Sequence, residues 1–301
     1  MITTDPSITT NGVTNFGTIY RGSTDDGAFT LWAFGSTSAF DTALGIDDVF
    51  FADANHLPIA ILKFQSLSLT GNPMIDLSNG GGTKLGLIGV DGITSGPPGG
   101  TLTFTGLDLL VLATVNGSIN LTSDVSFQDL SELAMYARGA SSNLTIDSTI
   151  SNIGILELDA EGSIQLTNSG TMSVGEFDAT AGNNLTLQVG SLLLDGKVRL
   201  NTLVLPGTTV TTGANLTLNV TGDYTNSSAT ESSHLDVTNG GAHIGTGGNI
   251  DVSIGGDLTT TGSAGDFSLV VHNTNGQIDN GANITVTTGG SVNRGGVESP
   301  R

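Results

Sequence analysis

The chain has 301 residues, among them 44 Gly, with only 5% aromatic and 12% charged residues, and its hydrophobic content of 37% is too high for a disordered chain. Its 28 acidic and 8 basic side chains give a net charge of −20, which argues against nucleic acid and anionic membranes as partners, because both attract basic surfaces. The absence of Cys excludes disulfides and thiolate metal ligands, and the sequence lacks the roughly 18 consecutive apolar residues of a membrane-spanning helix, so we expect no membrane insertion.

Residues 1–64 differ in composition from the rest of the chain. They contain the single Trp, Trp32, and seven of the eleven Phe residues, which are Phe16, Phe29, Phe34, Phe40, Phe50, Phe51 and Phe64. A repeat protein must close its first repeat, since unpaired strand edges template aggregation. We therefore predict that residues 1–64 form an irregular, aromatic-rich N-terminal cap. The alternative is a platform on which a substrate stacks.

Residues 65–292 have the alternating pattern of short strands. From Leu57 the segments PIAILKF, SLSLT, MIDL and KLGLIGV read as strands separated by glycine-rich turns. Within 156–190 one pattern is written twice at a spacing of 21 residues, so that Leu156 corresponds to Phe177 and Ile164 to Leu185. Alternation of period two indicates strands with one buried face, and a fixed repeat length indicates a repeat architecture. The sequence therefore predicts an all-β chain, a parallel β-solenoid, over residues 65–292.

The same pattern extends toward the N-terminus at an offset of 45 residues. Val111 and Ala113 then correspond to Leu156 and Leu158, with an intermediate repeat that starts at Leu133. The segment DLSELAMYARG allows a short helix, but its place in the repeat favours a strand. The predicted first residues of successive repeats are Val111, Leu133, Leu156, Phe177, Leu203, Leu235 and Leu269.

The C-terminal third repeats at 34 residues. Asn215, Asn249 and Asn283 recur at this offset, each followed by an apolar residue. We interpret the longer unit as the shorter one with extra residues in its turns. The predicted core comprises Leu156, Ile164, Phe177, Leu185, Leu216, Ile250 and Ile284. The three Asn residues are candidates for a stacked amide ladder, or alternatively for residues that merely tolerate the turn conformation.

Candidate catalytic and metal-binding residues are few. Asp223 and Asp257 coincide at the offset of 34, but Ser291 follows them in the third repeat, so we expect no calcium site. The pairs 25–26 and 47–48 are carboxylates of the kind used by polysaccharide hydrolases and lyases, yet only His56 and few basic residues accompany them. His234, His243 and His272 are scattered and read as turn residues. We therefore expect no catalytic residue, no metal and no cofactor.

A third class, an ice-binding protein, is suggested by threonine-rich strands such as 101–105. That function needs threonines aligned across repeats on a flat face. The repeat instead places Asp251 between Thr217 and Thr285, which argues against it.

The segments GSIQLTNSGTMS, GNNLTLQVG, GANLTLNVTGDYTN and GGNIDVSIGGDLTTTG resemble the passenger regions of filamentous-haemagglutinin-type adhesins and autotransporter-like bacterial surface proteins. The resemblance covers roughly residues 101–292. It implies a single-stranded right-handed parallel β-helix, that is, one formed by a single chain, together with export to the bacterial cell surface and a structural or adhesive role. The implied partners are a host-surface or extracellular glycan or protein, and an outer-membrane secretion partner or anchor. No functional residue can be transferred from these families.

Two functional hypotheses follow from these observations. The first is a β-helical stalk or adhesin without catalysis. The second is a carbohydrate-binding or polysaccharide-cleaving β-helix that uses the aromatic N-terminal block or a lateral groove.

Neither end of the chain looks complete, because the N-terminus lacks signal-peptide features and residues 293–301 form a polar tail where the pattern stops. We therefore expect either that an export signal has been removed or that the chain is a section of a longer protein.

Overall fold

The computed structural model describes residues 13–15, 59–64, 66–69, 74–76, 84–95, 102–139, 141–204, 209–240, 243–261, 266–274 and 277–294. Every regular element in these ranges is a β-strand, so they contain no helix able to cross a membrane. Most of the predicted N-terminal cap and of the polar tail lies outside the described residues. The carboxylate pairs 25–26 and 47–48 and His56 lie outside them as well.

The N-terminal strands include all four predicted from the sequence, and they run parallel to their partners. β2 lies before the expected boundary at residue 65, yet it pairs with β5. The strands are β1 (Val13–Asn15), β2 (Ile59–Phe64), β3 (Ser66–Leu69), β4 (Met74–Asp76), β5 (Lys84–Gly89), β6 (Ile93–Ser95), β7 (Leu102–Thr105), β8 (Leu109–Thr114) and β9 (Ile119–Leu121).

The middle of the chain has the longest strands, and DLSELAMYA is a strand as predicted. These strands are β10 (Val125–Ala137), β11 (Leu144–Asp147), β12 (Thr149–Ala160), β13 (Ile164–Ala181), β14 (Leu185–Leu194) and β15 (Val198–Val204). The C-terminal third contains β16 (Thr209–Thr212), β17 (Leu216–Val220), β18 (Tyr224–Asn226), β19 (Ser233–Gly240), β20 (His243–Thr246), β21 (Ile250–Ile254), β22 (Leu258–Thr260), β23 (Phe267–Thr274), β24 (Gln277–Asn280), β25 (Ile284–Thr288) and β26 (Val292–Arg294).

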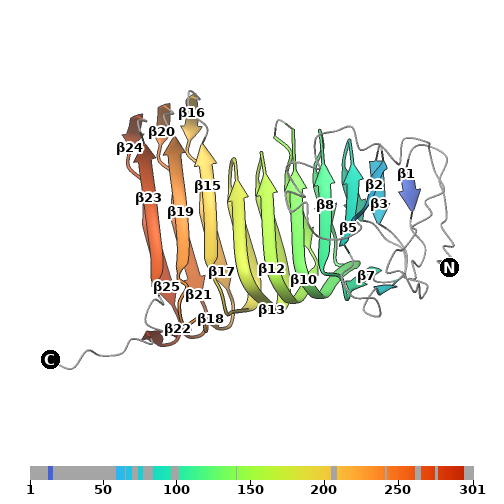
Figure 1. Ribbon diagram of the computed structural model, residues 1–301. Helices are drawn as coiled ribbons and strands as arrows, with labels where there is room; N and C mark the ends of the chain where they lie inside the picture. The colour runs from blue at the N-terminus through green and yellow to red at the C-terminus, as the bar shows by residue number, and fades with distance from the viewer. Residues whose placement is uncertain are drawn as a thin grey trace.

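Each strand pairs in parallel with the corresponding strand of the next repeat. Leu156 lies opposite Phe177, which confirms the spacing of 21, and Leu216 lies opposite Ile250, which confirms the spacing of 34. The pairings join 23 strands into one hydrogen-bonded sheet. Figure 1 shows its long strands side by side, with their order in space following their order along the chain. The protein is thus an all-β chain built mainly from a parallel sheet.

The core is a continuous column of apolar side chains on alternate residues of the strands. One cluster extends from Leu67 to Leu258. Within it the Phe104 and Phe127 rings of paired strands stack with their centroids 5.6 Å apart. Each fully buried Leu, Ile or Phe contributes about 1.5–3 kcal/mol, and it does so only when the neighbouring repeats cover it.

Six of the seven predicted core residues are at most 1% exposed: Leu156, Ile164, Phe177, Leu185, Leu216 and Ile250. Ile284 differs, because its side chain is 48% exposed. Its strand β25 pairs with β21, and no other described strand covers its second edge. The alternation correctly aligns Ile284 with Ile250 on the preceding strand. It cannot show that no described strand covers Ile284 on the other side.

Four predicted repeat starts are out of register: Val111 and Leu203, and also Leu235 and Leu269, which pair with each other but lie in line with Leu200, two residues after the partner of Phe177. Leu110, not Val111, lies opposite Leu133, so Val111 faces the other side of the sheet in a second apolar cluster. All six residues of β8 are buried, and a uniformly apolar strand gives no alternation from which to read its register. Phe177 lies opposite Val198 rather than Leu203.

The error at Leu203 comes from a polar residue on the inner face. Thr202 lies opposite Ala181 and Val237 and is fully buried. Its hydroxyl has no hydrogen-bond partner in the structure. A buried hydroxyl without a hydrogen-bond partner is uncommon. The sequence pattern therefore places Thr202 on the outer face and takes Leu203, one residue later, as the first inward-facing residue.

The extra residues of the 34-residue unit do more than lengthen turns. β16, β20 and β24 form a second, three-stranded parallel sheet. This small sheet has a core of its own made by Val204, Ala214 and Ile244, with Val210 and Ile278 packed against it. Figure 1 shows the three strands together beyond the ends of β15, β19 and β23.

Candidate functional site

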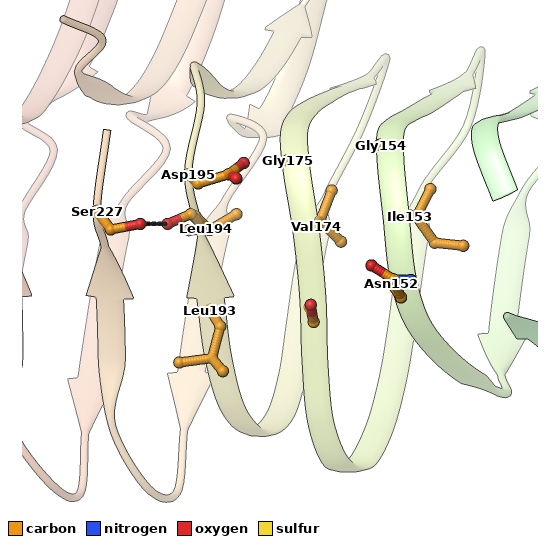
Figure 2. A pocket seen from close by; sticks show the side chains of 10 residues that line it. Asn152, Ile153, Gly154, Val174, Gly175, Leu193, Leu194, Asp195 and Ser227 are labelled. Carbon is orange, nitrogen blue, oxygen red and sulfur yellow. Dashed lines mark hydrogen bonds between the residues drawn. The ribbon is translucent and has the colours of Figure 1, made fainter. Parts of the chain in front are cut away.

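A lateral groove of about 390 Å³ opens across β12, β13 and β14. Figure 2 shows that its residues come from successive, parallel strands, so that equivalent positions of neighbouring repeats line up along it. The lining residues are Asn152, Ile153, Gly154, Ser173, Val174, Gly175, Leu193, Leu194, Asp195 and Ser227.

Stacked glycines lie along this groove. A Cβ atom on Gly154 would lie 2.4 Å from the Ser131 carbonyl oxygen, and one on Gly175 would lie 2.4 Å from the Gly154 carbonyl oxygen. Gly196 continues the row, with a Cβ position 2.7 Å from the Gly175 oxygen. Only glycine permits so close an approach between the backbones of successive repeats.

The rim combines polar groups with an exposed apolar side chain. Asn152 has a φ of 54° and donates from Nδ2 to Oδ1 of Asp129 at 2.6 Å, which fixes one end. Ser227 donates its hydroxyl to the Leu194 carbonyl oxygen at 3.1 Å, the contact drawn in Figure 2. Leu193 is 42% exposed.

The groove offers the chemistry of a binding surface. Asp195 is its one carboxylate, whereas glycoside hydrolysis needs two carboxyl groups facing each other. Hydroxyl, amide and carboxylate groups beside Leu193 suit a ligand with hydroxyls and an apolar face. The sequence suggested a lateral groove without locating it, although Gly154, Gly175 and Gly196 recur at the 21-residue spacing.

The predicted Asn ladder is brought together in successive repeats. The side-chain Oδ1 of Asn215 accepts the backbone N–H of Asn249 at 2.9 Å, and Oδ1 of Asn249 accepts that of Asn283 at 2.9 Å. Asn184 begins the row by accepting from the Asn215 backbone at 2.9 Å. The side chains therefore bond mainly to the next backbone, and only Asn184 and Asn215 share an amide-to-amide contact, at 3.3 Å.

The stacked acids behave similarly. Oδ1 of Asp223 accepts the backbone N–H of Asp257 at 2.8 Å, and Oδ1 of Asp257 accepts that of Ser291 at 2.7 Å. Hydrogen bonds to charged acceptors are stronger than neutral ones, which offsets the repulsion between neighbouring carboxylates. Within the described ranges no group of three or more His, Asp or Glu residues is arranged to hold a metal ion.

A second polar group lies on the outer face of β10, β12 and β13. Desolvation by burial raises the pKa of Glu157, and negative neighbours including Asp178 raise it further, against the opposing hydrogen bond from Tyr136. Burial also raises the pKa of Glu132 and of Asp178, while Arg199 acts in the opposite direction on Asp178. Glu157 and Asp178 lie opposite each other on neighbouring strands, and Glu132 lies opposite Ile155, two residues before Glu157, on the same face of the sheet.

Arginines neutralise part of this face. Arg138 forms a two-pronged hydrogen bond with both carboxylate oxygens of Asp159, each at 3.0 Å, and its guanidinium lies over the Tyr136 ring. Arg199 lies 3.7 Å from Asp178. The arrangement strengthens the contact between adjacent strands rather than exposing a nucleophile or a base.

The three histidines lie on strands β19, β20 and β23, so the prediction that they are turn residues is wrong, and they do not converge. His243 Nε2 lies 3.2 Å from both carboxylate oxygens of Asp279, whose pKa is lowered by this hydrogen bond and by one from Gln277. His272 lies 3.8 Å from Asp236, and His234 is exposed on β19.

No family model, no curated protein and no solved structure matches the chain.

Proposed function

We propose that this chain is a section of a right-handed parallel β-helix belonging to an exported structural or adhesive protein of the bacterial surface, acting without catalysis or a cofactor. The observation that supports this most is how the recurring polar residues are used. Asn215, Asn249, Asp223 and Asp257 each accept a backbone N–H of the next repeat. These side chains join one repeat to the next, as the side chains of a stalk would. The remaining surface is then available for adhesion.

The proposed partners follow from that role. They are an outer-membrane secretion partner or anchor and a host-surface or extracellular glycan or protein. The net charge of −20 favours solubility at high local concentration and disfavours nucleic acid.

The alternative function is a carbohydrate-binding or polysaccharide-cleaving β-helix. The groove favours its binding form, because Asn152, Asp195 and Ser173 line it together with the exposed Leu193. Sugars present hydroxyl groups and apolar ring faces, which match such a lining.

A glycan array combined with a reducing-sugar assay separates these functions. We expect binding without turnover, or no binding, and turnover of any polysaccharide would overturn the structural and adhesive proposal. If a glycan binds, Asp195→Asn and Leu193→Ser should weaken the signal, while the control Thr186→Ala on β14 should not. Small-angle X-ray scattering should show an elongated particle, and a compact globule would contradict the β-helix.

A further inference from the structure

The small sheet has an open edge where the short repeats meet the long ones. β16 pairs with β20 on one side, and no described strand pairs with its other side. In the preceding repeats the chain turns back at 161–163 and 182–184, without a strand equivalent to β16. The sheet therefore begins abruptly, as Figure 1 shows at β16.

The exposure of the aligned apolar side chains in this sheet shows that its first strand lacks a neighbour on one side. Val210, Ile244 and Ile278 lie opposite one another on β16, β20 and β24. Ile244 has a strand on each side and is 0% exposed, whereas Val210 and Ile278 have one each and stay partly exposed. An added strand beside β16 would bury Val210 as its neighbours bury Ile244.

A hollow of about 480 Å³ lies at this edge. Val204, Val210 and Ala214 supply its apolar wall, and Glu161 and Asn183 lie on its polar side. The turns at 161–163 and 182–184 are joined to each other, since the Asn183 N–H donates to the Gly162 carbonyl oxygen at 3.0 Å. The hollow therefore lies beside the edge of β16 that no described strand pairs with.

We propose that this edge binds an extended peptide of another protein, which adds to β16 as a further parallel strand. Main-chain hydrogen bonds to a sheet edge supply affinity, and pockets for alternate side chains supply specificity. The register calls for a β-branched aliphatic residue beside Val210, flanked by small polar residues as in β16 itself. Glu161 and the net charge of −20 favour a peptide with positive charge. The site does not depend on export or on the adhesive role.

The test uses a fluorescent peptide that copies residues 207–215, GTTVTTGAN, with a lysine added at each end, and a scrambled version as control. Fluorescence anisotropy with the full chain should show saturable binding of the copy and not of the scrambled peptide. Val210→Lys should weaken binding at least ten-fold, because an inward-pointing charge blocks strand addition. Glu161→Gln should weaken it about two- to five-fold, the range of an exposed ion pair.

Ile278→Lys is the matched control, since it places the same charge in the same column at the far edge of the sheet. It should leave binding unchanged, and circular dichroism should show that both lysine variants retain their strands. Absence of binding, or equal loss in both lysine variants, would overturn the proposal. Self-association of the protein through this edge would also overturn the proposal. It would appear in sedimentation as a dimer that Val210→Lys abolishes, together with no binding of the peptide.

Discussion

The backbone N–H of Asn249 donates to Oδ1 of Asn215 at 2.9 Å across 34 residues of sequence. The same side-chain oxygen is offered by Asn249 to Asn283. Each amide thus supplies the acceptor for a backbone donor at the entry of the next strand, where the sheet ladder has not yet begun.

Asn215→Ala should lower the free energy of unfolding by about 0.5–1.5 kcal/mol, because it leaves the Asn249 N–H without its acceptor and also removes the longer bond from Asn215 Nδ2 to Asn184. Urea unfolding followed by circular dichroism measures the change. Asn219→Ala, on the same strand β17, should change stability by less than about 0.5 kcal/mol. Equal effects of the two substitutions would show that the stacked position has no special role.

Leu185→Ala should cost about 2–5 kcal/mol, because the side chain is fully buried between Ile164 and Leu216 in adjacent strands. Thr186→Ala, one residue along and on the outer face, should stay within about 0.5 kcal/mol. The two unfolding curves, measured side by side, test the assignment of inner and outer faces. A larger loss at Thr186 would reverse that assignment.

Gly175→Ala should destabilise the chain by more than 1 kcal/mol, roughly as overpacking does, because its Cβ would lie 2.4 Å from the Gly154 carbonyl oxygen. Gly281→Ala provides the control, since nothing lies within 4 Å of the Cβ position there. Thermal melting of both variants gives the comparison. If Gly175→Ala melts with the wild type, the backbones at the groove separate without cost.

The outer carboxylates predict a pH dependence. Burial raises the pKa of Glu157 above its ordinary value of 4.5, so the folded chain holds this proton more tightly than the unfolded chain does. Stability therefore falls as pH rises from about 4.5 through the raised value. Glu157→Gln should stabilise the protein at pH 7.5, by less than about 1 kcal/mol because the site is half-exposed, and should lose this advantage at pH 4. Urea midpoints at both pH values provide the measurement, with the exposed Glu161→Gln as control.

The sequence predicts well those features that repeat with regular alternation. The pairing of Leu156 with Phe177 and the burial of Ile250 follow from spacing, because a side-chain period of two leaves one inner face. It fails where alternation is absent or disguised. At β8 both faces are apolar, and at Thr202 a polar side chain points inward, so each gives an error of register.

The candidate sites were harder to predict than the strands. The lateral groove includes Gly154 and Gly175, where the backbones of successive repeats approach closely, and their recurrence at 21 residues is difficult to distinguish among the many turn glycines of this sequence. The small sheet was hidden for another reason. Its strands β16, β20 and β24 have only four residues each, so they read as part of an enlarged loop.

The register of one repeat on the next also sets how the chain can fold. Leu185 finds its partner Leu216 in the following repeat and Ile164 in the preceding one, and it needs no segment from farther away. A chain organised in this way can acquire structure directionally, each completed layer serving as the template for the next while the remainder is still unfolded. Such a polypeptide can pass through a narrow pore as an unfolded, extended chain and fold as it emerges. The most recently folded repeat then templates the next one.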